Sequence, residues 1–179
     1  MGIKSKLKHT ISFLLHGEAK PIYASIHYLA PNEHLKGKKI VITGGGRGLG
    51  FAMAKKFVSE GAKVLIAGRN EQTLKQSASE INCLYLPLDV QDTTSFKEFI
   101  DKADQMLGGL NCLVNNAGIS LHEEGFLAVS PQHFDSQVGT NLRGCFFLTQ
   151  TFIEKCNETH VKGTKNILFT SSETSMTVD

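Results

Sequence analysis

The stretch Lys39–Gly50, KIVITGGGRGLG, is an apolar segment that runs directly into a glycine-rich turn. Its β-branched run Ile40–Ile42 is typical of a strand covered on both faces of a parallel sheet. Glycines then remove Cβ atoms where the backbone turns tightly and approaches a ligand, at Gly44, Gly45, Gly46, Gly48 and Gly50. Apolar residues at helical spacing follow until Gly61, on a stripe of Leu49, Ala52, Met53, Ala54, Phe57 and Val58. The free N–H groups and the positive dipole end of that helix favour a pyrophosphate at the turn.

The composition indicates one compact domain, because 41% of the 179 residues are hydrophobic and can build a core. Residues 1–39 hold seven Lys and Arg against two Asp and Glu, which leaves twelve against fifteen in the remainder. That balance argues against a nucleic-acid partner for the body of the chain. The cysteines are widely spaced, without a C-x-x-C pair or a His cluster, so we expect buried thiols in a reducing compartment, the cytoplasm, and no metal site; they are Cys83, Cys112, Cys145 and Cys156.

Residues 1–36 read as an extension in front of the main domain, which spans residues 37–179. A short basic amphipathic helix is predicted at Ile3–Leu15, with Lys4, Lys6 and Lys8 mostly off its apolar face. Its apolar run is too short to span a bilayer and lacks the features of a secretory signal. Docking on the protein's own surface or on a second subunit is favoured over binding to a membrane surface, which stays possible.

Four more strands are predicted, at Ala62–Ala67, Cys83–Leu88, Leu110–Val114 and Asn166–Phe169. The helices between them are expected to begin at the N-cap residues Asn70, Asp92 and Ser130, the last with Pro131 in its first turn, and one ends at Gly108–Gly109. The first two carry the apolar stripes Leu74, Ala78 and Ile81, then Phe96, Phe99, Ile100, Ala103 and Leu107, and the long third helix carries Phe134, Val138, Leu142, Cys145, Phe146, Thr149 and Phe152 at helical spacing. Part of this last stripe, with Phe134, Phe146 and Phe152, is expected to be exposed in a chain that stops after the fifth strand. The polar loop with His122, Glu123 and Glu124 is interpreted as solvated charges over a cleft rather than as a metal or acid–base site.

Two further patterns are motifs in a fixed order along the chain. T-G-x-x-x-G-x-G is carried by Thr43, Gly44, Gly48 and Gly50, and N-N-A-G by residues 115–118, whose Asn side chains can tie strand ends together. With these motifs in this order, the chain resembles the short-chain dehydrogenase/reductase family from Lys36 to Asp179. The resemblance implies an α/β fold, a Rossmann-type doubly wound parallel sheet with strand order 3-2-1-4-5 in this chain. The cofactor would lie across the carboxyl edge where the order reverses.

The expected cofactor is NADP. Gly68 stands where NAD-dependent family members usually carry an acid, and Arg69 follows it, while Arg47 in the glycine turn supplies a second cation for a 2′-phosphate. The resemblance also places Asp89 beside the adenine, with Val90 close by. The full set of expected cofactor-binding residues is Thr43, Gly44, Gly46, Arg47, Gly48, Leu49, Gly50, Arg69, Asn70, Asp89, Val90, Asn116, Ala117 and Gly118.

The resemblance further implies two catalytic residues: Ser172 to orient the substrate oxygen and Asn141 to hold a water in a proton relay. The family's proton donor, a Tyr about a dozen residues past that Ser with a Lys four residues later, is not in the sequence, whose only tyrosines are Tyr23, Tyr28 and Tyr85. Hydride transfer to a carbonyl needs a proton for the developing alkoxide. We therefore expect an inactive fragment of an oxidoreductase that interconverts a carbonyl and a secondary alcohol and that is a homo-oligomer at full length. The alternative is a non-catalytic nucleotide-binding or scaffold module.

Overall fold

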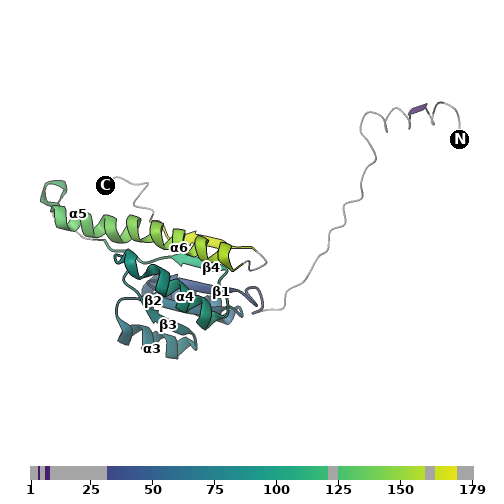
Figure 1. Ribbon diagram of the computed structural model, residues 1–179, viewed down its shortest axis with the longest axis horizontal. Coiled ribbons are helices and arrows are strands. Elements are labelled where there is room, and N and C mark those ends of the chain that lie inside the picture. The colour runs from purple at the N-terminus through teal and green to yellow at the C-terminus, as the bar shows by residue number, and fades with distance from the viewer. Residues whose placement is uncertain (1–3, 5–6, 9–31, 121–124, 160–163, 173–179) are drawn as a thin grey trace.

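The computed structural model describes residues 4, 7–8, 32–120, 125–159 and 164–172 (Figure 1). The helix predicted at residues 3–15 lies outside the described residues except for Lys4, Leu7 and Lys8, which are helical and exposed. The polar loop at residues 121–124 also lies outside them. No helix within the described residues combines the length and the hydropathy that crossing a bilayer requires.

Five parallel strands form one sheet with the order β3-β2-β1-β4-β5, as predicted (Figure 1). The strands are β1 (Lys39–Thr43), β2 (Lys63–Gly68), β3 (Leu84–Pro87), β4 (Cys112–Asn115) and β5 (Asn166–Phe169). The order reverses between β1 and β4, where Val41 pairs with Leu65 on one side and Leu113 on the other. At this point the chain leaves neighbouring strands toward helices on opposite faces of the sheet, so a crevice opens above the carboxyl ends of the strands.

Helices cover both faces of the sheet. On one face lie α2 (Gly48–Ser59) and α3 (Glu71–Ile81), and on the other lie α4 (Phe96–Leu107) and α6 (Cys145–Glu158). The core on the α4–α6 side is built around Phe96, Phe152 and Leu148, all fully buried. The short helix η1 (Thr93–Ser95) directly precedes α4. Between β4 and α6 the chain also forms the short helices η2 (Phe126–Ala128) and α5 (Pro131–Val138) and the π-helical turn η3 (Gly139–Gly144).

The helix boundaries follow the predicted capping residues. Asn70 accepts a hydrogen bond from the Thr73 amide, and Ser130 accepts one from the His133 amide. Gly108 ends α4 in the left-handed conformation. Asp92 caps the short turn η1 that leads into α4 rather than α4 itself.

The apolar stripe predicted for α2 is corrected by the structure. Leu49 and Ala52 are both exposed, and Leu49 is 70% exposed because it lies in the first turn of α2, beyond the edge of the sheet. On the long helix, Phe134 and Phe146 are exposed, as expected for part of its apolar stripe, and so is Leu142, whereas Phe152 is buried. The π-helical turn contributes to this pattern, since one extra residue per turn shifts the buried face to Thr140, Gly144, Leu148, Phe152 and Cys156.

Candidate functional site

The glycine-rich turn between β1 and α2 keeps the backbone N–H groups at the start of α2 available. No side chain caps the helix, whose N-cap is Arg47, and its first turn contains no acidic residue. Gly44 and Gly48 adopt positive φ angles of 65° and 55°. A Cβ atom on Gly50 would overlap the carbonyl oxygen of Gly44, so the helix approaches the turn more closely than any other residue would allow.

Thr43 and Asn116 fasten the ends of neighbouring strands. The buried hydroxyl of Thr43 donates to the Val114 carbonyl at 3.3 Å and accepts from the amides of Asn116 and Ala117, both at 3.0 Å. The side-chain amide of Asn116 donates to the carbonyls of Thr43 (3.0 Å) and Gly44 (3.3 Å), and its oxygen accepts from the Thr170 hydroxyl. These bonds connect β1, β4 and the segment after β5, as the N-N-A-G motif predicted.

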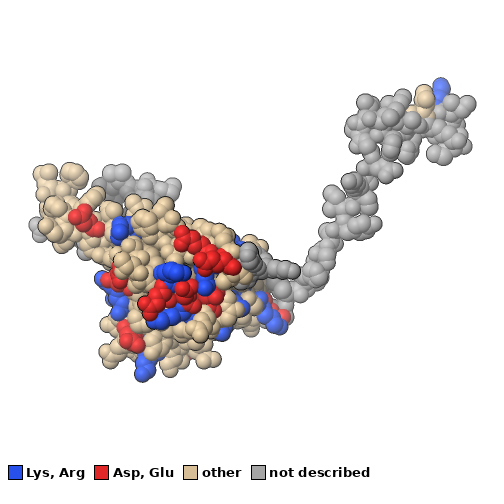
Figure 2. Space-filling model, viewed as in Figure 1, with Lys and Arg blue, Asp and Glu red and all other residues tan. Residues whose placement is uncertain are grey.

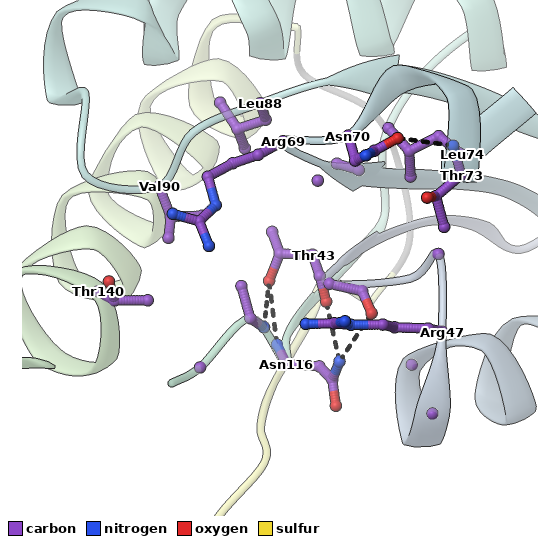
Figure 3. Close-up of a pocket in the computed structure, with 18 of the residues that line it drawn as sticks. Thr43, Arg47, Arg69, Asn70, Thr73, Leu74, Leu88, Val90, Asn116 and Thr140 are labelled. Carbon is purple, nitrogen blue, oxygen red and sulfur yellow. Dashed lines mark hydrogen bonds between the residues drawn. The ribbon is translucent and has the colours of Figure 1, made fainter. Parts of the chain in front are cut away.

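A cleft of about 590 Å³ opens above this junction (Figure 3). Every residue that the sequence predicted for cofactor binding lines it, from Thr43 to Gly118. The volume lies within the range of small-molecule and cofactor sites, about 300–1,000 Å³. The lining residues absent from that predicted set are Ala67, Gly68, Thr73, Leu74, Leu88, Ile119 and Thr140.

For two of these additional residues, the sequence gives a weak indication that they lie at the cleft, because they are close in the chain to predicted residues. Thr73 lies one helical turn after the cap residue Asn70, and Thr140 directly precedes Asn141. Leu74 and Leu88 read as core residues, and they are buried, but their side chains also form the floor of the cleft. Only the folding of loops from different strands to one edge brings these side chains together.

Two positively charged side chains line the cleft. Arg47 and Arg69 both line it and are both exposed, and within the described part of the chain neither has an ion pair or a side-chain hydrogen bond (Figure 3). The one carboxylate among the lining residues is Asp89, whose oxygen accepts from the Gln91 amide at 3.0 Å. Two uncompensated guanidinium groups next to a free helix N-terminus suit a ligand with several phosphate groups.

The two predicted catalytic residues do not line the cleft. Asn141 lies in the π-helical turn, and its amide bridges both backbone groups of Ile119, donating to the carbonyl at 2.7 Å and accepting from the N–H at 2.9 Å. Ile119 itself lines the cleft, so Asn141 holds one wall. Ser172 follows β5 and is exposed. Tyr85 lies inside β3, at the opposite side of the sheet from β5.

The cysteines form no site among the residues described here, and no cluster of His, Cys, Asp and Glu in those residues could hold a metal ion. All four thiols are unpaired; Cys112 and Cys156 are buried as predicted, while Cys83 and Cys145 are partly exposed. Burial raises the pKa of Cys83 and of Cys112 to about 11, which keeps both thiols protonated at neutral pH.

Comparisons with known proteins agree with this geometry. The sequence model of a family described as short chain dehydrogenase matches residues 38–178. A 2,5-dichloro-2,5-cyclohexadiene-1,4-diol dehydrogenase of Sphingobium indicum is 41% identical over 117 residues, which cover 63% of this chain and 46% of the relative. An NADP-dependent (R)-specific alcohol dehydrogenase of Lentilactobacillus kefiri is 32% identical over 127 residues, covering 69% of this chain and 50% of that protein.

Among solved structures, the chain is similar to a 3-ketoacyl-(acyl-carrier-protein) reductase from Brucella melitensis complexed with NADH. The TM-score is 0.73 and the sequence identity 35%, with 77% of this chain and 58% of that chain covered. The chain spans about half the length of the curated relatives it matches.

Proposed function

Because the chain belongs to the short chain dehydrogenase family, we propose that it is the nucleotide-binding part of an NADP-dependent oxidoreductase that interconverts a carbonyl and a secondary alcohol. The observation that carries the proposal is that two arginines without an ion-pair partner among the described residues, Arg47 and Arg69, line the cleft above the sheet's switch point. The cofactor would supply the hydride; the residues of this chain bind it and orient it.

The residues present fit a dinucleotide phosphate. The uncapped first turn of α2 faces the cleft and provides N–H donors for the pyrophosphate. Gly68 ends β2 without a carboxylate that would repel a 2′-phosphate, and Arg69 follows it. The Lentilactobacillus kefiri relative is NADP-dependent, which supports the assignment, whereas the Brucella melitensis structure contains NADH. The binding experiment below therefore compares NADPH with NADH.

On the substrate side we assign Ser172 to orienting the reacting oxygen and Asn141 to holding the water of a proton relay. The Asn141 side chain already binds both backbone groups of Ile119. A relay water would therefore bind to the donor and acceptor positions of this side-chain amide that the two bonds do not use. Neither residue can replace a tuned tyrosine, whose loss as general acid costs roughly 10²–10⁴ in rate. We expect these 179 residues to bind nucleotide without turnover.

A non-catalytic nucleotide-binding module remains the second candidate function. The observation that favours it is that neither Asn141 nor Ser172 lines the cleft. Reading the coding sequence beyond Asp179 distinguishes the two functions, because the oxidoreductase requires Tyr-x-x-x-Lys there. A small-molecule carbonyl or alcohol is the proposed substrate, and the four unpaired thiols suit the cytoplasm.

The cofactor assignment is tested by titrating NADPH and NADH into the wild-type chain and an Arg69→Ala variant. A charge-assisted phosphate contact is worth about 1.5–3 kcal/mol, so the NADPH affinity should fall roughly 10- to 150-fold while the NADH affinity stays within about twofold. Arg143→Ala is the matched control, because Arg143 stacks on Phe147 in α6 and does not line the cleft. An unchanged ratio of the two affinities in Arg69→Ala would show that Arg69 does not bind the 2′-phosphate.

A further inference from the structure

The loop that follows β3 has a defined conformation next to the cleft. The Asp89 carboxylate accepts from the Gln91 amide at 3.0 Å, and the Asp89 carbonyl accepts from the Asp92 amide at 3.1 Å. Val90, between these anchors, is buried and lines the cleft. The loop therefore presents the Val90 side chain in one orientation.

The π-helical turn η3 lies directly against this loop. A Cβ atom on Gly144 would overlap the Val90 carbonyl oxygen, and one on Gly139 would touch the side chain of Gln91 at 3.9 Å. Thr140, between the two glycines, is 6% exposed and lines the same cleft as Val90. Glycine at position 144 lets two elements that are about 50 residues apart in the sequence meet at the wall of the cleft, whereas the contact at Gly139 is of ordinary length.

Gln91 connects the two elements through its side-chain amide. Its Nε2 donates to the Thr140 hydroxyl at 2.8 Å and lies 3.3 Å from the Ser136 hydroxyl and 3.5 Å from the Ser136 carbonyl. The bond to Thr140 is the shortest of the three. Both partners are shielded from solvent, Thr140 fully and Gln91 in part, so water competes little for this bond.

This hydrogen bond determines where the Thr140 side chain points. Thr151 and Thr159, further along the same helix, donate back to the carbonyl four residues earlier, at 3.0 Å each. Within the described residues Thr140 makes no such bond, and its hydroxyl accepts from Gln91 instead. In Figure 3 the oxygen of Thr140 lies close to the helix, and its carbon atoms extend toward the cleft near Val90.

We propose that Gln91 is a positioning residue of the nucleotide site: it fixes Thr140 against the 89–91 loop, so that Val90 and the Thr140 methyl group form one apolar wall for the purine ring. The inference rests on the proposed function, because it requires an adenine nucleotide in the cleft. A planar ring gains affinity from a preformed apolar wall, and a wall whose two halves move independently costs ordering entropy on binding.

The test is a double-mutant cycle of Gln91→Met and Thr140→Val in the full 179-residue chain, read as the dissociation constant for NADPH. Gln91→Met keeps the length and the contact with Gly139 but removes the amide donor. Loss of one neutral hydrogen bond corresponds to a rise of about three- to tenfold in the dissociation constant. The double variant should be no weaker than the weaker single variant, since both substitutions break the same bond. Gln105→Met, on the exposed last turn of α4, is the control and should leave the constant unchanged.

The titrations are made well below the melting temperature of each variant, so that lower stability alone would not change the dissociation constant. Thr140→Val breaks the bond from its other side and keeps the inference testable if Gln91→Met does not fold. Wild-type NADPH affinity in Gln91→Met would overturn this inference and leave the proposed function intact. If Gln91→Met does not fold, wild-type affinity in Thr140→Val has the same meaning. The inference also fails if the rise in the dissociation constant of the double variant equals the product of the two single-variant rises. If the wild-type chain binds neither NADPH nor NADH, the proposed function fails and this inference fails with it.

Discussion

Gly50 decides how closely α2 can approach the turn that precedes it. The position needs no unusual backbone angle, but an added Cβ atom would overlap the Gly44 carbonyl oxygen and lie 2.5 Å from the Asn116 side-chain nitrogen. Neither neighbour can move easily, because Gly44 is backbone and Asn116 is hydrogen-bonded to Thr43 and Gly44. The glycine is therefore required by packing rather than by conformational freedom.

We predict that Gly50→Ala lowers the free energy of unfolding by at least about 2 kcal/mol, although alanine is the better helix former. Gly46→Ala is the matched control in the same turn. Its Cβ atom would meet only side-chain methyl groups, of Leu74 at 3.3 Å and of Thr73 at 3.5 Å, and should be accommodated. Urea denaturation followed by circular dichroism measures both variants. Equal stability of the two would contradict the close approach at Gly50.

At the scale of elements, α4 and α6 are joined by an ion-pair network at their outer surface. The ammonium group of Lys155 on α6 lies 2.8 Å from an Asp101 oxygen and 3.9 Å from an Asp104 oxygen, both on α4. Its side chain is only 19% exposed, and one oxygen of Asp104 is buried without a hydrogen-bond partner. Removing Lys155 would leave a partly buried carboxylate without compensation.

Lys155→Met should therefore lower the free energy of unfolding by about 1–2 kcal/mol. Lys97→Met is the control, because Lys97 is a well-exposed partner of the same Asp101 at 3.6 Å, and its loss should cost under about 0.5 kcal/mol. Chemical denaturation at pH 7 compares the two. Similar decreases of the free energy of unfolding in both variants would mean that the shielded position of Lys155 does not strengthen its ion pairs.

The same pair gives a pH dependence with a defined sign. The hydrogen bond from Lys155 lowers the pKa of Asp101 from its usual value of 3.8. A lowered carboxyl pKa contributes stability above the unfolded-state value, and that contribution is lost as the pH falls through the folded-state value. The difference between wild type and Lys155→Met should thus be full at pH 7 and shrink below about pH 4.

At the scale of the whole molecule, charged side chains of both signs are interspersed over the face shown in Figure 2, which carries no continuous basic surface. The exposed apolar side chains at β5 and α6 are more unusual than this charge distribution. At β5, which is an edge strand in this chain, Leu168 and Phe169 are 44% and 57% exposed, and Phe146 on α6 is 60% exposed. An unpaired apolar edge recruits other chains, and exposed aromatic surface is normally buried in an interface.

We predict that the 179-residue chain associates in a concentration-dependent way. Replacing both Phe146 and Phe169 with Lys should shift gel-filtration profiles toward the monomer, because charge on an edge opposes pairing between chains. Met106→Lys, at the far end of α4, is the control and should leave the profile unchanged. A monodisperse wild-type monomer over the whole concentration range would contradict this prediction. Of the aromatic residues predicted for this surface, Phe152 takes no part, since it is fully buried.

Local chemistry in the sequence was sufficient for the strands, for the capping residues Asn70 and Ser130, and for the glycine turn that lines the cleft. Strand β1 is buried on both faces as its β-branched run predicts, and Asn116 binds backbone at the adjacent strand end. The family motifs added the order of the strands, because they mark which strand ends face the crevice. These features depend on short-range sterics and hydrogen bonding, which a linear pattern records directly.

Only the tertiary structure decided which face of the long helix is buried and which side chains complete the cleft. The π-helical turn at Gly139–Gly144 rotates the helix so that Phe134 and Phe146 point outward, and it brings Thr140 against Val90. A regular helical period cannot predict that rotation, because it arises where the helix meets a loop about 50 residues away in the sequence. The pairing of Gln91 with Thr140 depends on the same meeting of distant segments, and neither residue type signals it alone.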